Sequence, residues 1–583
     1  TLNTSLKDKY TEVTDNFEGE YDILQGFKAK VRIGFNRKFS RSDQFYPANH
    51  LKFNSEQELQ KKGSYQINEG ESQTMNYDFS LNFSRQVKEL HYLFGFLSYS
   101  LDETTYEENI YKAEGFPSDR MNSIFFARQY AEDTKPQGAE STTRNIGVNA
   151  VFNYSYDDRL LFDATFRTNA SSQFGANQRW GNFWSLGAGW NMHNEKWLRS
   201  KEWFSRLKLR ASVGSTGSQG NNAYQSLATY NYSEKNYENK LGAYLMGMEN
   251  KDLKWQKKMD YNVGMDMSVK NNFNLVFDYY QSTTENLLVA FTLPPSTGFT
   301  TVQENVGKVR NTGIELSMSY MVLSRPQDRT FLTLSLRAAH NKNRVVKISD
   351  SMKAYNEKMD EMAESDSKLV TKYYDGVSMN AIWAVRSLGI DPATGREIYL
   401  TKDGVSTYEY RAEDMVVCGD NLPKLRGSFG INLGYKGFGL NVMCMYELGA
   451  KMYNETLVDR VENVNMSYAV DKRVLEGRWQ KPGDKVRFRS LKQVWDPEKQ
   501  AYKVDEKTYA TSRFVQKKNE LNISSINFSY DFFRHAFVKK MGMERLSVAF
   551  YMNDVAKLST IKTERGLSYP FARNYNFSLQ MTF

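Results

Sequence analysis

Residues 575–583, at the end of the chain, read YNFSLQMTF. Apolar side chains stand at every second position from Tyr575 to Phe583, and polar side chains fill the positions between them. Successive side chains of a β-strand point to opposite faces of its sheet. This segment therefore predicts a strand with one apolar face and one polar face.

The same alternation recurs along the chain, in about 17 segments of roughly 10 to 15 residues, of which 146–156 and 425–435 are clear examples. Strands of globular proteins average about 5 to 6 residues, whereas a tilted strand needs about 9–11 residues to cross a bilayer. The faces opposite the apolar ones carry Ser, Thr, Asn, Gly, Lys and Arg, which are too polar for the core of a sandwich. We therefore predict an all-β fold, a transmembrane antiparallel β-barrel with an apolar outside and a polar inside.

The composition of the 583-residue chain excludes several other classes of protein. Aromatic residues make up 14% of the chain, although the mean hydropathy is −0.64, and disordered chains contain few aromatics. Two cysteines exclude a disulfide scaffold, and no run of 18 apolar residues predicts a membrane-spanning helix. The net charge of +9 is spread along the chain, without the basic stripe that nucleic-acid binding needs.

The connections between the predicted strands alternate between a mostly short set and a long set. The shorter connections are residues 24–25, 85–89, 157–158, 194–205, 271–272, 324–328, 436–437 and 534–541. The longer ones are residues 41–72, 102–143, 170–182, 215–256, 283–310, 345–423, 450–519 and 554–570. Bacterial outer-membrane barrels have short periplasmic turns and long extracellular loops, so we place the shorter set in the periplasm.

Strand parity then predicts that this chain is part of a larger barrel. The first clear strand, 12–23, and the last, 573–583, both run toward the periplasm in this orientation, which requires an odd number of strands. Single-chain bacterial barrels have an even number. We therefore expect Thr1 to follow a cut or a break in an extracellular loop, with the missing strands supplied upstream.

The terminal aromatic residue Phe583 stands in the apolar register of the last predicted strand. This position resembles the C-terminal signal by which outer-membrane barrels are recognised for assembly. The alternative is a chance terminal Phe. We interpret Phe583 as the barrel-assembly signal because it falls in the outward register.

Further segments resemble the motifs of one family and occur in the order of that family. They read YDDR at 156–159, FRTNASSQFG at 166–175, RWGNF at 179–183, LKLRAS at 207–212, NVGKVRNTGIEL at 305–316 and RWQKPGD at 478–484. These segments are similar to signatures of the SusC-like TonB-dependent outer-membrane transporters of the Bacteroidetes. The departures are local: Asn169 and Ala170 replace Asp-Gly, and Trp184 replaces Pro.

The resemblance implies a 22-stranded barrel around a plug, of which residues 1–583 form the C-terminal part, strands 6 to 22, without the plug, the TonB box and the first strands. It implies TonB-dependent active import of a large nutrient, an oligosaccharide or oligopeptide, across the outer membrane of a Gram-negative bacterium. The implied partners are a SusD-like surface lipoprotein, the TonB complex and a companion N-terminal segment that carries the plug. A passive porin or a surface adhesin is the alternative, and the sequence does not distinguish glycan from peptide.

No catalytic, metal or cofactor site is predicted, because the five histidines do not pair at metal-ligand spacing. The acidic stretch 350–366 is interpreted as a solvated helix, since its carboxylates are too widely spread for calcium. Aromatic residues in the two longest loops are the candidate substrate contacts, because flat rings stack on sugars and other extended ligands. Packing of the loops or an interfacial aromatic girdle is the alternative. The candidates are Tyr373, Tyr374, Trp383, Trp479 and Trp495.

Overall fold

The computed structural model describes residues 3–583 except 132–134, 200, 202, 219–222, 233–241, 293–300, 367–368, 464–469, 491–492, 497–500, 505–507, 534 and 563–570. The chain divides into two compact units. Residues 1–188, 214–257 and 288–305 form the first unit, and residues 189–213, 258–287 and 306–583 form the second.

Among the described residues, eighteen strands belong to one sheet. Apart from the two-residue strand β5 (Gln129–Tyr130), these are 17 long strands, which confirms the predicted fold class and strand number. The long strands are β1 (Ser5–Leu24), β2 (Phe27–Tyr46), β3 (Ser64–Val87), β4 (His91–Glu114), β6 (Gln137–Tyr156), β7 (Leu160–Ser171), β8 (Trp180–Asn191), β9 (Phe204–Ser218), β12 (Gln256–Val269), β13 (Phe273–Thr292), β14 (Thr301–Arg325), β15 (Thr330–Lys347), β20 (Leu425–Tyr435), β21 (Phe438–Tyr453), β24 (Val515–Asp531), β25 (Arg545–Ser559) and β26 (Tyr575–Thr582).

Tight turns join neighbouring strands at the predicted short connections. Strands β20 and β21 pair up to Tyr435 and Phe438, so that two residues close the hairpin. Both turn residues have positive φ, as do those of several other hairpins, which suits the right-handed twist of the flanking strands. The turn residues with positive φ are Gly26, Lys88, Glu89, Asp157, Asp158, Lys270, Asn271, Lys436 and Gly437.

Several strands are longer than the alternation predicts. Strands β3 and β4 are 24 residues long and pair without interruption. At about 3.3 Å per residue they extend roughly 80 Å, far more than the ~30 Å hydrocarbon core of a bilayer. The predicted loops 41–72 and 102–143 were therefore too wide, because backbone pairing continues through segments such as 107–109 that are polar on both faces.

The second unit shows how the two faces of the sheet differ. Phe429 pairs with Leu336 of β15 on one side and with Cys444 of β21 on the other. This apolar face also carries Leu440, as the alternation predicts, whereas Ser428 and Asn441 lie on the opposite, polar face. Phe429 and Leu336 remain 36% and 37% exposed, so the apolar face is uncovered by the described protein.

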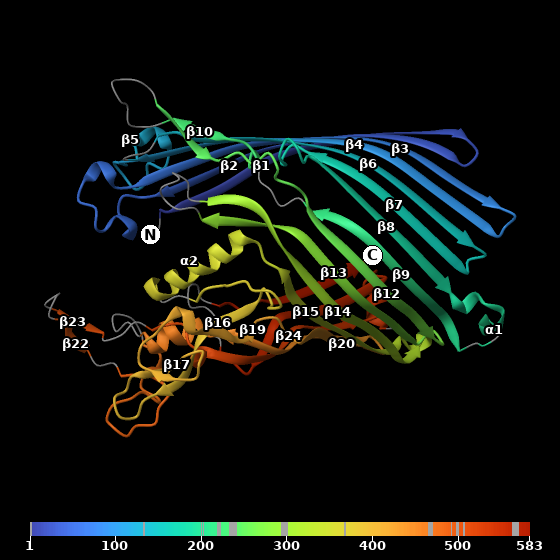
Figure 1. Ribbon diagram of the computed structural model, residues 1–583. Helices are drawn as coiled ribbons and strands as arrows, with labels where there is room; N and C mark the ends of the chain where they lie inside the picture. Colours follow the sequence, from blue (N-terminus) through green and yellow to red (C-terminus); the bar gives the residue numbers. More distant parts are fainter. Residues whose placement is uncertain are drawn as a thin grey trace. The chain divides into compact units, whose positions relative to one another are not determined.

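Two long loops of the second unit fold into one compact group, here named the loop module (residues 348–424 and 454–514). Its elements are α2 (Asp350–Asp366), β16 (Ala381–Ile390), β17 (Glu397–Leu400), β18 (Ser406–Thr407), η7 (Ala412–Asp414), β19 (Met415–Asp420), α3 (Glu455–Leu457), η8 (Val458–Glu462), η9 (Lys472–Val474), β22 (Gln493–Asp496), β23 (Ala501–Val504) and η10 (Ser512–Phe514). Strands β18, β17, β16 and β19 form a separate four-stranded sheet. Figure 1 shows α2, β16, β17 and β19 beyond one end of β15 and β20.

Helix α2 has the predicted bounds but is not solvated on all sides. Met352, Met359 and Ala363 are buried, and the last two pack in a cluster with Trp383 and Tyr399. The helix face that carries these three residues is therefore buried, and Met359 and Ala363 attach it to the small sheet. The carboxylates lie on the other faces of the helix.

The remaining short elements lie in connections. They are η1 (Leu51–Phe53), η2 (Leu59–Lys61), η3 (Ile124–Phe126), η4 (Met192–Asn194), α1 (Lys196–Arg199), β10 (Thr229–Tyr232), β11 (Ala243–Gly247), η6 (Pro326–Asp328) and α4 (Ala536–Lys540). In the described part of the chain, the model contains no helix with the length and apolar character needed to cross a membrane.

Candidate functional site

The loop module brings two of the predicted substrate contacts close together. The ring of Tyr374 lies 5.1 Å from that of Trp383, and the Lys372 ammonium lies 5.7 Å from both ring centroids. Lys372 is held there by the Asp360 carboxylate at 2.6 Å. Tyr374 is 39% exposed and Trp383 only 7%, so Tyr374 offers the accessible ring face.

Tyr373 is fixed mainly by its backbone. The Asn356 side chain accepts a hydrogen bond from its N–H at 2.8 Å and donates one to its carbonyl at 2.6 Å. Its ring packs 5.8 Å from Tyr355, and burial raises the pKa of Tyr373. These two hydrogen bonds from Asn356 fix the backbone at Tyr373. The next residue, Tyr374, lies at the surface.

Trp479 belongs to the RWQKPGD segment and is 7% exposed. Its indole N–H donates to the Pro392 carbonyl at 2.9 Å, and its ring fills the space beside Gly395. The neighbouring Arg478 donates to three backbone carbonyls, those of Val461, Val474 and Arg489. Through the bond from Trp479 to Pro392, the RWQKPGD segment connects the second loop of the module to the first. Trp495 lies in β22, and its side chain is outside the described residues.

A buried ion network joins the same two loops. The Arg513 guanidinium contacts Glu397 of β17 at 2.8 Å and Glu462 of η8 at 2.7 Å, and Thr511 donates to Glu397 at 2.8 Å. Burial opposes the charged form of Arg513, but the two carboxylates outweigh this effect and raise its pKa. The network holds the two loops of the module together.

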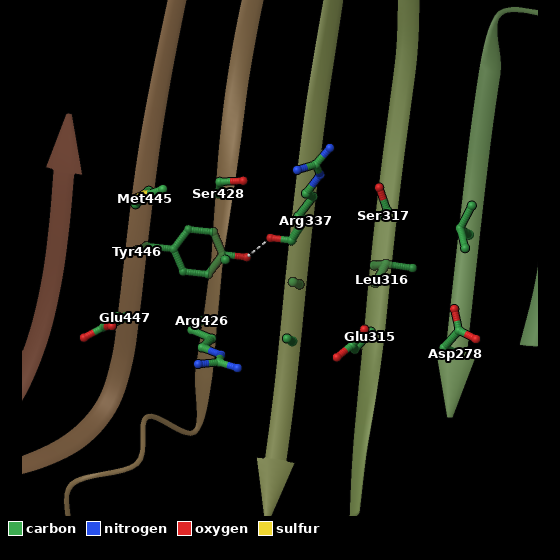
Figure 2. A pocket seen from close by; sticks show the side chains of 14 residues that line it. Asp278, Glu315, Leu316, Ser317, Arg337, Arg426, Ser428, Met445, Tyr446 and Glu447 are labelled. Atoms are coloured by element: carbon green, nitrogen blue, oxygen red, sulfur yellow. Dashed lines mark hydrogen bonds between the residues drawn. The ribbon is translucent and has the colours of Figure 1, made fainter. Parts of the chain in front are cut away.

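The polar face of the second unit contains a groove of about 480 Å³ (Figure 2). Five adjacent strands, β13, β14, β15, β20 and β21, contribute to it. Its side chains on the polar face include Asp278, Glu315, Ser317, Arg337, Ala339, Arg426, Ser428, Met445 and Glu447.

The register of the strands places these side chains in two rows, which Figure 2 shows one above the other. One row runs Ser317, Arg337, Ser428 and Met445, and the next runs Glu315, Ala339, Arg426 and Glu447. The small residue Ala339 leaves a gap between the carboxylate of Glu315 and the guanidinium of Arg426. The groove therefore presents opposite charges on either side of an open floor.

Two of the acidic residues in the groove are already neutralised by ion pairs. Arg210 contacts Asp278 at 2.7 Å, and Lys518 contacts Glu447 at 2.8 Å. Among the residues that the structure describes, Glu315, Arg337 and Arg426 have no ion-pair partner within 4 Å. These three side chains are exposed and are the charges that a solute in the groove would meet.

These groove residues are not among the candidates predicted from the sequence. Each is an ordinary charged residue at a polar position of an alternating strand, and β15 and β20 are separated by the first loop of the loop module. A signal exists in the small residue Ala339, which pairs with Arg426 across the two strands. This signal can be used only when the register between β15 and β20 is known.

A known protein family matches most of this sequence. The family described as TonB dependent receptor-like, beta-barrel matches residues 2–470. The chain belongs to this family. It is a SusC/RagA-like barrel of the bacterial outer membrane, and the family consists of transporting receptors, not enzymes.

Individual relatives agree with this assignment. TonB-dependent receptor P39 of Formosa agariphila is 24% identical over 91% of this chain and 53% of its own length. TonB-dependent receptor SusC of Bacteroides thetaiotaomicron is 28% identical over 48% of this chain and 29% of its own length. The chain thus spans about half the length of the first relative and less than a third of the second. The structure of the RagAB peptide transporter has a TM-score of 0.84 at 18% identity, covering 100% of this chain and 63% of that chain, and shows the same fold.

In a barrel of this family the apolar face of the sheet contacts lipid and the polar face lines the lumen. The groove is therefore part of the lumen wall. Tyr373, Tyr374, Trp383, Trp479 and Trp495 stay predicted substrate contacts. Phe583 directly follows β26 and is 78% exposed, and its role as an assembly signal also stays a prediction.

Proposed function

We propose that this protein imports a large nutrient, an oligosaccharide or oligopeptide, across the outer membrane by TonB-dependent active transport. The observation that carries the proposal is the charged groove on the lumen face of a SusC/RagA-like barrel. A large polar solute moving along this wall can exchange its hydration for contacts with charged and hydroxyl side chains. An apolar wall would offer no such exchange.

The proposed partners are a SusD-like surface lipoprotein, the TonB complex and a companion N-terminal segment that carries the plug. The family assignment supports them, as do relatives that are about twice as long as the chain region they share with it. Co-purification from native outer membranes tests the lipoprotein. A protein recovered without any lipoprotein under mild extraction would contradict that part of the proposal.

Substrate uptake by living cells separates active import from the alternative, a passive porin or adhesin. Nutrient uptake should stop when the proton gradient is collapsed or TonB is deleted, and the purified protein should conduct little current in a planar bilayer. Uptake that persists without TonB, together with a large open conductance, would favour the porin. Cell attachment without any uptake would favour the adhesin.

Tyr374 is the substrate contact that the loop module supports best, because its ring is exposed beside Trp383 and Lys372. Replacing a stacking ring removes about 1–3 kcal/mol when the ring lies against a flat ligand, by analogy with base stacking. Tyr374→Ala should therefore weaken substrate binding, whereas Tyr408→Ala, at a similarly exposed tyrosine (43%) elsewhere in the module, should not. Equal affinities of the two variants would remove Tyr374 from the site.

A further inference from the structure

Within the part of the chain that the structure describes, three charges in the lumen groove have no ion pair, and their arrangement limits the ligands that fit. Across the strands, Glu315 aligns with Ala339, and Ala339 aligns with Arg426. Two strand spacings of about 4.8 Å separate the backbones of Glu315 and Arg426 by roughly 10 Å. The carboxylate and the guanidinium therefore flank a space floored by a methyl group.

A second guanidinium, that of Arg337, lies in the other row of the groove, and Figure 2 shows it pointing away from Arg426. Arg337 pairs in register with Ser428, so it lies one row from Arg426 on the adjacent strand. Figure 2 shows the two arginines on β15 and β20, with Glu315 on the next strand, β14. Guanidinium groups bind carboxylates through two parallel hydrogen bonds. The side of the groove that carries Arg426 therefore suits a carboxylate.

On the opposite side, the charge that has no ion pair among the described residues is the carboxylate of Glu315. Glu315 has no cationic partner in the described part of the chain, and Asp278 nearby on the same face is already neutralised by Arg210. A neutral sugar chain offers hydroxyl groups but no charges to match the carboxylate and the guanidinium, and an acidic one would be repelled by Glu315. A ligand with an ammonium at one end and a carboxylate at the other satisfies both sides.

We propose that this groove binds short zwitterionic peptides, with the carboxylate on Arg426 and the ammonium on Glu315. The inference rests on the proposed import function and narrows its substrate class. It concerns the lumen wall and is independent of the aromatic residues in the loop module. The groove would then be a binding site in the lumen that holds a peptide by both of its charges.

The test uses the protein purified from its outer membrane and calorimetric titration with trialanine that has free termini. Glu315→Gln and Arg426→Gln should each weaken binding roughly 10- to 100-fold, since hydrogen bonds to charged groups contribute about 1.5–3 kcal/mol. Lys436→Gln, which removes a cation in the turn between β20 and β21, is the matched control and should have no effect. Trialanine with both termini blocked should bind no better to the parent protein than to the variants.

A charge exchange distinguishes loss of the binding site from misfolding of the variants. The double variant Glu315→Arg with Arg426→Glu should recover most of the affinity, because a zwitterion can bind in the reversed direction. Equal affinity of the parent, Glu315→Gln and Arg426→Gln for trialanine would overturn the inference. Tetragalacturonate binding that needs Arg426 and tightens in Glu315→Gln would instead assign the groove to acidic glycans.

The inference and the proposed function fail in different ways. Energised uptake of a glycan that is unchanged in Glu315→Gln and Arg426→Gln, without trialanine binding, would overturn the inference and leave active import standing. Trialanine binding that depends on Glu315 and Arg426, in a protein whose uptake ignores the proton gradient, would keep the groove and overturn active import.

Discussion

The phenol of Tyr446 donates a 2.9 Å hydrogen bond to the backbone carbonyl of Arg337. Tyr446 lies on β21 and Arg337 on β15, so the bond reaches across the intervening strand β20. It passes over Gly427, which pairs directly with Tyr446. A side chain on Gly427 would collide with both the Arg337 carbonyl and the Tyr446 hydroxyl. One glycine therefore lets an aromatic side chain tie three strands together.

Loss of this tie should measurably destabilise the barrel. Tyr446→Phe removes one hydrogen bond and should lower the free energy of unfolding by about 1 kcal/mol. Tyr435→Phe is the matched control, because no hydrogen bond of its hydroxyl is found among the described residues. Urea-induced unfolding in detergent or lipid, followed by tryptophan fluorescence, measures both. Equal midpoints for the two variants would show that the bond contributes nothing.

The two faces of β20 should respond differently to the same substitution. Phe429→Arg places a charge on the lipid face and should cost about 2–4 kcal/mol if the residue lies near the bilayer midplane. Ser428→Arg places the same charge on the lumen face, where water is available, and should cost much less. Unfolding titrations in lipid vesicles measure both costs. Similar losses would contradict the face assignment.

Much of the strand architecture was predictable from local sequence. The alternation at 425–435 matches β20, the two-residue turn at 436–437 is present, and α2 spans the predicted 350–366. These features depend on residues close together in the chain. The outer ends of β3 and β4 were missed because the residues next to them, such as 68–74 and 107–109, are polar on both faces and interrupt the alternation. Beyond this interruption Tyr65 and Ile67 pack in a buried cluster with Phe45 and Phe116.

The sites were less accessible to prediction because they depend on long-range contacts. Trp479 is predicted as a substrate contact, yet its indole N–H bonds to Pro392, 87 residues away. The charges of the groove come together only through the register of strands on either side of the loop module. A single sequence indicates which face each strand presents, but not which residues of distant strands become neighbours.

Epitope insertion tests the orientation of the barrel. A short tag after Gly404, an exposed position with φ +85° between β17 and β18, should be detected by antibody on intact cells. The same tag between Lys436 and Gly437, in the tight turn, should be detected only after the outer membrane is permeabilised. Outer-membrane fractionation confirms that both tagged proteins are assembled. The reverse labelling pattern would invert the orientation.

Removal of Arg513 should loosen the loop module. Arg513→Met removes the cation of the buried Glu397 and leaves Glu462 with Arg489 at 3.6 Å, and breaking a buried ion pair typically costs about 3–5 kcal/mol. The module should then become sensitive to external protease on intact cells, while the barrel remains resistant. Arg411→Met removes an exposed arginine that pairs with Glu409 and should leave the resistance unchanged. Full resistance of Arg513→Met would mean that hydrophobic packing alone holds the module.

The turn formed by residues 480–484 should open in acid. The backbone N–H groups of Lys481 and Gln480 donate to the Asp484 carboxylate at 2.9 and 3.0 Å and lower the pKa of Asp484. A carboxyl group with a lowered pKa stabilises the folded turn at neutral pH, and this stabilisation is lost as the pH falls below about 4, the ordinary aspartate pKa. Hydrogen exchange corrected for intrinsic rates should show protection of both amides at pH 7 that declines between pH 4 and pH 3. Asp484→Ala should lack the protection at every pH, whereas Asp403→Ala, at an exposed aspartate of the same module, should behave like the parent. Protection that persists unchanged at pH 3 in the parent would show that the charge of Asp484 does not hold the turn.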